Sequence, residues 1–244
     1  MNKPGRLIVS IDGPTLTPIE RDMLQHPMIA GVILFPPNYL EPTDYKDKTQ
    51  LKELIADITR HGDKTCFVDQ EGGYVQRFGR GFKSLPAAQL FGEMYDLNPE
   101  LAKQMAYDYG AHMAEELMQF GIISFAPVCD LDGGNIVISR LNRAFHAHPA
   151  ACTELLMAYI DGMNSKGMQA TGKHFPGHGH ILGDTHTHKV ADDRSLSELE
   201  AKDLSVFIKL IAANKLAAIM PAHIVYPQVD AQHTAGTSQI WLQK

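Results

Sequence analysis

The stretch Lys64-Thr-Cys-Phe-Val-Asp-Gln70 indicates the fold class, because it is a short apolar run that ends beside a carboxylate. Near-continuous apolar runs, without alternating polar residues, are typical of strands buried on both faces of a parallel sheet. Five other stretches share this character. The six predicted strands are Arg6–Asp12, Ala30–Phe35, Lys64–Gln70, Ile122–Asp130, Met168–His174 and Ala217–His223.

Segments with helical signals separate these strands. Asn98-Pro99-Glu100 combines an N-cap, a first-turn proline and a first-turn acid, and apolar residues then recur every fourth position until Gly121. Ser195-x-x-Glu198 is a capping box that predicts the start of another helix. Lys52–Arg60 and Ala150–Lys166 are also predicted to be helical. This alternation of strands and helices predicts an α/β fold.

Two α/β architectures fit this order, a doubly wound sheet and a TIM barrel. The turn after the first strand, Ile11-Asp-Gly-Pro-Thr15, lacks the glycine pattern of a dinucleotide-binding sheet. Polar residues follow several different strands, as they do around the active site of a barrel. They are Asp12, Asp69, Asp130, Lys173, His174 and His223.

The pattern therefore favours a TIM (β/α)8-type barrel of which this chain covers about six strands. No linker, repeat or shift in composition divides the 244 residues. We expect a single (β/α) barrel catalytic domain over residues 1–244, incomplete at its C-terminus.

Composition narrows the class of protein. Lys and Arg number 22 against 28 Asp and Glu, and the net charge of −6 argues against non-specific binding to nucleic acid or to a membrane surface. No apolar run approaches the ~18 residues that span a bilayer, and Leu7–Ile11 is too short for a secretory signal. Cys66, Cys129 and Cys152 are predicted to be buried free thiols, which favours the cytoplasm.

Residues 172–189 hold five of the twelve histidines, and three interpretations of them stay open. The imidazoles would bind a metal ion together with Asp184, although no cysteine lies nearby. Alternatively, Asp184 orients His186, which gives and takes a proton near neutral pH. The third interpretation is a solvated glycine-rich loop. The clustering of His174, His178, His180, His186 and His188 beside Lys173 disfavours it.

Two more clusters carry charged residues. In Val68–Phe78, paired glycines follow Asp69 and Glu71, and either carboxylate would act as a catalytic acid or bind hydroxyl groups. A salt bridge that closes the turn is the alternative for Glu71. In Ser139–His146, arginines suit an anionic or amide-bearing ligand, with simple solvation as the alternative for Arg140.

With these motifs in view, the chain resembles the glycoside hydrolase family 3 β-N-acetylhexosaminidases of the bacterial cytoplasmic, peptidoglycan-recycling type. The signature is Lys173-His-Phe-Pro-Gly-His-Gly179 followed by Asp184-x-His186. The resemblance runs from the first predicted strand to the last residue. Four more stretches fit it: Gly31–Phe35, Val68–Gly73 with Gln76-Arg-Phe78, Ile123–Pro127 and Ile219–His223.

The resemblance implies a TIM barrel that removes terminal β-linked N-acetylglucosamine from peptidoglycan fragments (anhydro-muropeptides) with retention of configuration. By matched position, His186 is the general acid/base and Asp184 orients it. The residues expected to bind the sugar are Asp69, Arg77, Arg143, Lys173 and His174. The resemblance implies no cofactor and no metal. It implies a small sugar or muropeptide as substrate, and no nucleic acid, membrane or obligate protein partner.

One departure from the family pattern limits this expectation. The family's aspartate nucleophile lies in a Ser-Asp-Asp-Leu-like motif after the seventh strand, and residues 1–244 contain no such motif. We therefore expect these residues to be the N-terminal part of such an enzyme, without hydrolase activity by themselves and with two open barrel edges.

Other functions stay open. One is an N-acetylglucosaminide phosphorylase, because a histidine acid/base repels an incoming phosphate less than a glutamate does. The others are a non-catalytic sugar-binding remnant and a metal-dependent hydrolase.

Overall fold

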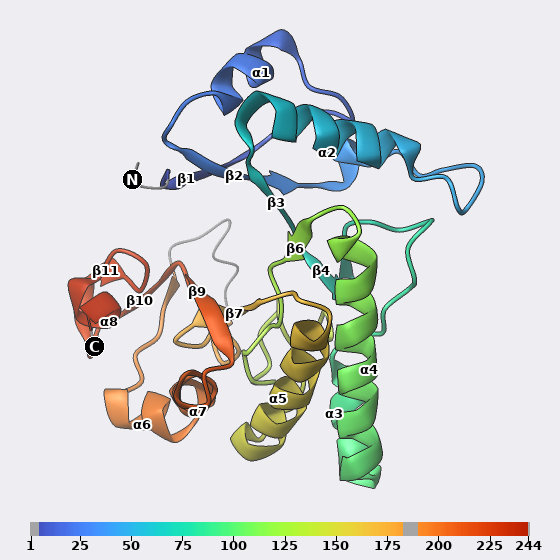
Figure 1. Ribbon diagram of the computed structural model, residues 1–244. Coiled ribbons are helices and arrows are strands. Elements are labelled where there is room, and N and C mark those ends of the chain that lie inside the picture. Colours follow the sequence, from blue (N-terminus) through green and yellow to red (C-terminus); the bar gives the residue numbers. More distant parts are fainter. Residues whose placement is uncertain (1–4, 183–189, 244) are drawn as a thin grey trace.

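Parallel strands form the centre of the computed structural model, which describes residues 5–182 and 190–243 (Figure 1). One parallel sheet has the order β1 (Leu7–Ser10), β2 (Ile29–Leu34), β3 (Thr65–Val68) and β6 (Ile122–Ser124). Another pairs β7 with β9 in parallel, and their bounds are Ala170–Phe175 and Leu216–Pro221.

The segment that follows β6 connects these two sheets. The backbone N–H of Thr171 donates to the carbonyl of Ala126 at 2.9 Å, and that of Cys129 donates to the carbonyl of Lys173 at 2.6 Å. Val128 forms a parallel bridge with Lys173. The six main strands therefore follow one another in chain order, as in the wall of a (β/α) barrel.

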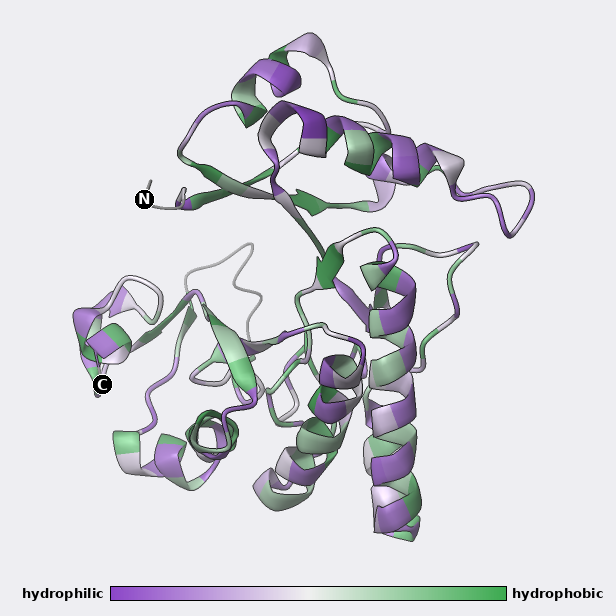
Figure 2. Cartoon of the chain, viewed as in Figure 1, coloured by the Kyte–Doolittle hydropathy of each residue, from purple (hydrophilic) through white to green (hydrophobic). Residues whose placement is uncertain are grey.

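Helices separate the strands in sequence. They are α1 (Pro18–Leu24), α2 (Thr49–Gly62), α3 (Gln89–Leu97), α4 (Pro99–Met118), α5 (Pro149–Ser165), α6 (Leu196–Ala201), α7 (Asp203–Ala212) and α8 (Gln239–Gln243), with a short 3-10 helix at Pro36–Asn38. Figure 2 shows hydrophobic residues along β2 and β6, and both hydrophobic and hydrophilic residues on the helices. None of the described helices combines the length and the apolar character needed to cross a membrane.

Small strands lie outside the predicted set. β4 (Gln70–Gly72) and β5 (Val75–Gln76) form an antiparallel hairpin directly after β3. A separate small sheet has the order β11-β10-β8. Its strands are β8 (Val190–Ala191), β10 (Ile224–Tyr226) and β11 (Asp230–Thr234).

All six predicted strands are present, but three details of the prediction are wrong. β6 ends at Ser124 rather than near Asp130, and Pro127 in the following segment has no N–H to donate to a ladder. β1 is not buried, since Leu7 is 50% exposed and Ile8 45%. Most of β9 is exposed too. Among the described residues, β1 and β9 are the outer strands, so each lacks a neighbour on one side.

The helix predicted from Ser195 begins as expected, because Ser195 and Glu198 form the capping box. It is interrupted at Lys202, and α7 starts at the next residue. Asp203, the first residue of α7, is fully buried and pairs with Arg194. The capping box thus marks the start of a short helix, and the apolar residues beyond it belong to a second one.

All three cysteines are free and buried, as predicted. Burial raises the pKa of the Cys66 thiol to about 12. It also raises the pKa of Cys152 to about 12, and the pKa of Cys129 well above its ordinary value.

Helices α4 and α5 lie side by side (Figure 1) and approach closely at two glycines. A Cβ atom on Gly110 would lie 2.2 Å from the carbonyl oxygen of Tyr159, and one on Gly162 would lie 2.0 Å from that of Tyr107. No side chain fits at such distances unless the helices separate.

We expect Gly110→Ala to destabilise the protein by about 1–3 kcal/mol, because the added methyl group meets backbone rather than a flexible side chain. Helix propensity alone would give the opposite sign, by about 1 kcal/mol. Urea unfolding measures the difference. Gly13→Ala is the matched control, since nothing lies within 4 Å of a Cβ there. A stabilised Gly110→Ala variant would contradict the packing argument.

Candidate active site

A cavity of about 390 Å³ lies at the carboxyl-terminal ends of the parallel strands. Ile33 of β2, Asp69 after β3, Lys173 and His174 of β7 and Met220 of β9 all line it. Parallel strands bring their carboxyl ends to one edge, which is where barrel enzymes place their chemistry. All five residues expected to bind sugar line this cavity: Asp69, Arg77, Arg143, Lys173 and His174.

Lys173 is at the centre of the charged groups, and only 2% of its side chain is exposed. Its Nζ lies 2.7 Å from Oδ1 of Asp69 and 2.6 Å from Oε1 of Glu71. A buried ammonium group requires such partners, because isolated charges are costly to remove from water. Arg77 approaches the same Asp69, with 4.0 Å between its Nη2 and Oδ2.

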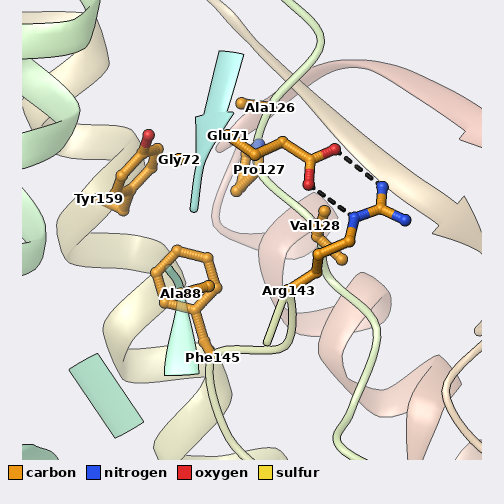
Figure 3. Close-up of a pocket in the computed structure, with 9 residues that line it drawn as sticks. All are labelled: Glu71, Gly72, Ala88, Ala126, Pro127, Val128, Arg143, Phe145 and Tyr159. Atoms are coloured by element: carbon orange, nitrogen blue, oxygen red, sulfur yellow. Dashed lines mark hydrogen bonds and ion pairs between the residues drawn. The ribbon is translucent and has the colours of Figure 1, made fainter. Parts of the chain in front are cut away.

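Glu71 binds Arg143 through both of its carboxylate oxygens (Figure 3). Arg143 Nε donates to Oε2 at 2.8 Å, and Nη2 donates to Oε1 at 2.9 Å. Burial alone would raise the pKa of Glu71, but the charge of Lys173 and the bonds from Arg143 lower it to about 2. The carboxylate is therefore ionised throughout the neutral range.

A second buried carboxylate supports His174. The distance between His174 Nδ1 and Asp130 Oδ2 is 2.7 Å, and the backbone N–H of His178 donates to Oδ1 of the same Asp130 at 2.7 Å. Burial would raise the pKa of Asp130, but His174 lowers it. With the proton on Nδ1 shared with this carboxylate, His174 keeps Nε2 as its other polar ring atom.

The predicted catalytic pair, Asp184 and His186, lies outside the described residues, and so does His188. Arg140 is exposed and does not line the cavity, and neither does Asp12. Among residues 5–182 and 190–243, no cluster of three or more His, Cys, Asp or Glu side chains is arranged to hold a metal ion.

Several residues of the cavity wall were not predicted from the sequence. Tyr74, in the turn between β4 and β5, is 72% exposed and lines the cavity. Apolar residues from 137–141 line it too. The glycine pair before Tyr74 signals a turn, but the sequence alone does not show which way that turn faces.

Residues 7–244 match the family model described as the glycosyl hydrolase family 3 N terminal domain. The chain belongs to this family.

Named relatives are similar over nearly the whole chain. The beta-hexosaminidase of Tolumonas auensis is 43% identical over 243 residues, which cover 98% of this chain and 69% of that protein. The beta-hexosaminidase of Neisseria meningitidis serogroup C is 44% identical over 244 residues, covering 98% of this chain and 65% of the relative. The chain thus spans about two thirds of the length of these glycoside hydrolases.

Among solved structures, NagZ from Neisseria gonorrhoeae in complex with N-trifluoroacetyl-D-glucosamine matches with a TM-score of 0.91 and 42% identity. The match covers 98% of this chain and 69% of that one. Together with the order of the six strands, it confirms the predicted α/β fold of the TIM-barrel type. The roles of the individual site residues stay predictions.

The depressed pKa of Glu71 gives an expected pH dependence of stability. A carboxyl group whose pKa falls from 4.5 to about 2 on folding stabilises the protein above pH 4.5. That contribution, on the order of 3 kcal/mol, is lost as the pH falls toward 2. Urea unfolding between pH 7 and pH 2 should show the wild type losing its advantage over Glu71→Gln in that range. A difference that stays constant with pH would exclude this origin.

Proposed function

We propose that this chain binds a terminal N-acetylglucosamine in the 390 Å³ cavity and forms most of the site of a β-N-acetylhexosaminidase. The observation that carries the proposal is that Asp69, Arg77, Arg143, Lys173 and His174 all line one cavity. The family and the names of the relatives support the same activity. Peptidoglycan fragments in the cytoplasm are the proposed substrates.

The cavity suits a polar sugar in both size and chemistry. Its volume lies within the range of about 300–1,000 Å³ that is usual for small-molecule sites. Asp69 is a hydrogen-bond acceptor for sugar hydroxyl groups, while the cationic side chains donate to hydroxyl and amide oxygens. Arg77 has guanidinium N–H groups to offer, since its Nη2 lies 4.0 Å from Asp69, beyond hydrogen-bond distance.

The cations of the cavity suit an anionic aglycone. Arg77 is the least neutralised of them, since its Nη2 lies 4.0 Å from Asp69, whereas Arg143 and Lys173 are paired with carboxylates at 2.6–2.9 Å. Arg77 would therefore attract a carboxylate of a muropeptide, even though the whole chain has a net charge of −6, because local charge governs binding.

Catalysis requires groups beyond this set. His186, oriented by Asp184, is the proposed general acid/base. A retaining glycosidase also needs a nucleophile. Among the described residues that line the cavity, Asp69 is the only carboxylate, and it is paired with Lys173. We therefore propose that the nucleophilic aspartate of the family comes from polypeptide outside residues 1–244.

The first test combines sugar binding with turnover in a sample whose intact mass matches 244 residues. We expect N-acetylglucosamine to bind in calorimetry, without hydrolysis of an aryl β-N-acetylglucosaminide. Turnover by the wild-type chain that is lost in His186→Ala would support the glycosidase activity. It would contradict the proposal that the nucleophile lies outside residues 1–244. A wild-type chain that binds no N-acetylglucosamine would contradict the proposed function.

We expect Arg77→Met to weaken N-acetylglucosamine binding about tenfold or more, because a charged donor to the sugar is worth roughly 1.5–3 kcal/mol. Arg80→Met is the matched control. Arg80 is three residues away and binds the carbonyl of Thr43, outside this cavity. Calorimetric dissociation constants of the two variants provide the comparison, and equal losses of affinity would contradict the assignment of Arg77.

Tyr74 is expected to contact the group that follows the terminal sugar. An exposed aromatic ring that lines a sugar site offers a flat apolar face for a second sugar ring, worth about 1 kcal/mol for each ~40 Å² of apolar surface buried. Tyr74→Ala should therefore weaken the binding of N,N′-diacetylchitobiose several-fold and leave the binding of the monosaccharide unchanged. An equal effect on both ligands would contradict this placement of the second sugar.

A further inference from the structure

We propose that Glu71 is a positioning residue, which holds the side chains of Arg143 and Lys173 in the orientation that binds the sugar. This inference rests on the proposed function of the cavity and adds a residue to it. Glu71 itself does not line that cavity, so it acts through the two cations.

Both oxygens of Glu71 are engaged with residues of the cavity. Oε2 accepts from Arg143 Nε, while Oε1 accepts from Arg143 Nη2 and lies 2.6 Å from Lys173 Nζ. A bidentate pair fixes the plane of the guanidinium group as well as its position. The third nitrogen, Nη1, donates to the carbonyl of Val137 at 3.1 Å. Arg143 is thus held from two sides.

The surroundings of Glu71 leave its carboxylate little room to move. Only 7% of the side chain is exposed. Behind it, Phe145 and Tyr159 help to enclose a space of about 10 Å³, enough for roughly one water molecule (Figure 3). A carboxylate with so little space keeps its geometry when the sugar enters or leaves.

The backbone on either side of Glu71 is fixed as well. The side chain of Gln70 accepts from the N–H of Phe78 at 3.0 Å and donates to the carbonyl of the same residue at 3.0 Å. Gly72 has φ +106°, and a Cβ there would lie 2.2 Å from the carbonyl oxygen of Pro86. The hairpin therefore fixes the position of Glu71 beside Arg143 and Lys173.

The partners of Glu71 distinguish this role from a salt bridge that only closes a turn. A bridge of that kind joins residues of the turn itself. Arg143 is 72 residues away in the sequence, and Lys173 belongs to β7. Both line the cavity, and their side chains must be held in one orientation to bind a sugar. Glu71 therefore connects the hairpin, the segment before Arg143 and β7 at the wall of the site.

Glu71→Gln tests the proposal, because glutamine keeps the volume but turns an NH2 group toward two cationic donors. We expect N-acetylglucosamine to bind at least tenfold more weakly. In a crystal structure of the variant, the side chains of Arg143 and Lys173 should leave their wild-type positions. Glu71→Asp keeps the charge, so it should restore part of the affinity. Glu20→Gln is the matched control, since Glu20 is also buried and lies on α1, outside the cavity.

The outcomes separate this proposal from the proposed function. An unchanged affinity, with both cations in their wild-type positions, would overturn the role of Glu71. If the wild-type chain binds no sugar, the proposed function fails, and the positions of Arg143 and Lys173 in the variant structure still decide the role. If Glu71→Gln does not fold, the structure of Glu71→Asp decides by the same criterion, because the shorter side chain cannot reach both cations from the same backbone position.

Discussion

The buried, ionised carboxylate of Glu71 requires cations around it, and this requirement determines how the charged side chains of the site are arranged. Glu71 is removed from water, and its contacts with Arg143 and Lys173 compensate for the lost hydration. The dependence is mutual, because without Glu71 the buried guanidinium of Arg143 would lose its carboxylate partner and Lys173 would lose one of its two. Hairpin β4–β5, strand β7 and the segment before Arg143 therefore form a single electrostatic unit. Asp69 extends this unit to the cavity surface through its bond with Lys173.

The parallel arrangement of the strands explains why Asp69, Lys173 and His174, which are far apart in the sequence, lie in one cavity. Each main strand runs in the same direction, so the residues that follow β3 and β7 emerge at one edge. Asp130 is placed in the same way. It follows the segment that pairs with β7, and its Oδ2 forms a hydrogen bond with Nδ1 of His174 on that strand. Two buried carboxylates thus support the polar side chains of the cavity. Glu71 pairs with the charges of Arg143 and Lys173, and Asp130 fixes the imidazole ring of His174.

Much of this arrangement could be predicted from the sequence, because local patterns carry it. Six apolar runs correspond to six strands, and the family resemblance pointed to five of the side chains that line the cavity. The hairpin β4–β5 was missed, since strands of two or three residues leave no periodic pattern. The exposure of β1 was also missed, because burial depends on neighbouring strands rather than on a strand's own residues. For Glu71, the two candidate roles could be separated only by knowing which distant cations it contacts.

The three buried thiols have a practical consequence for experiments in solution. A thiol reacts through its thiolate form, and burial raises the pKa of Cys66, Cys129 and Cys152 far above neutrality. All three sulfur atoms are also shielded from reagents in the folded chain. A fluorescent maleimide would thus label a cysteine introduced on the surface while leaving the native ones unmodified. The native cysteines can therefore be used to detect local unfolding, because each becomes reactive only when its part of the core is exposed to solvent.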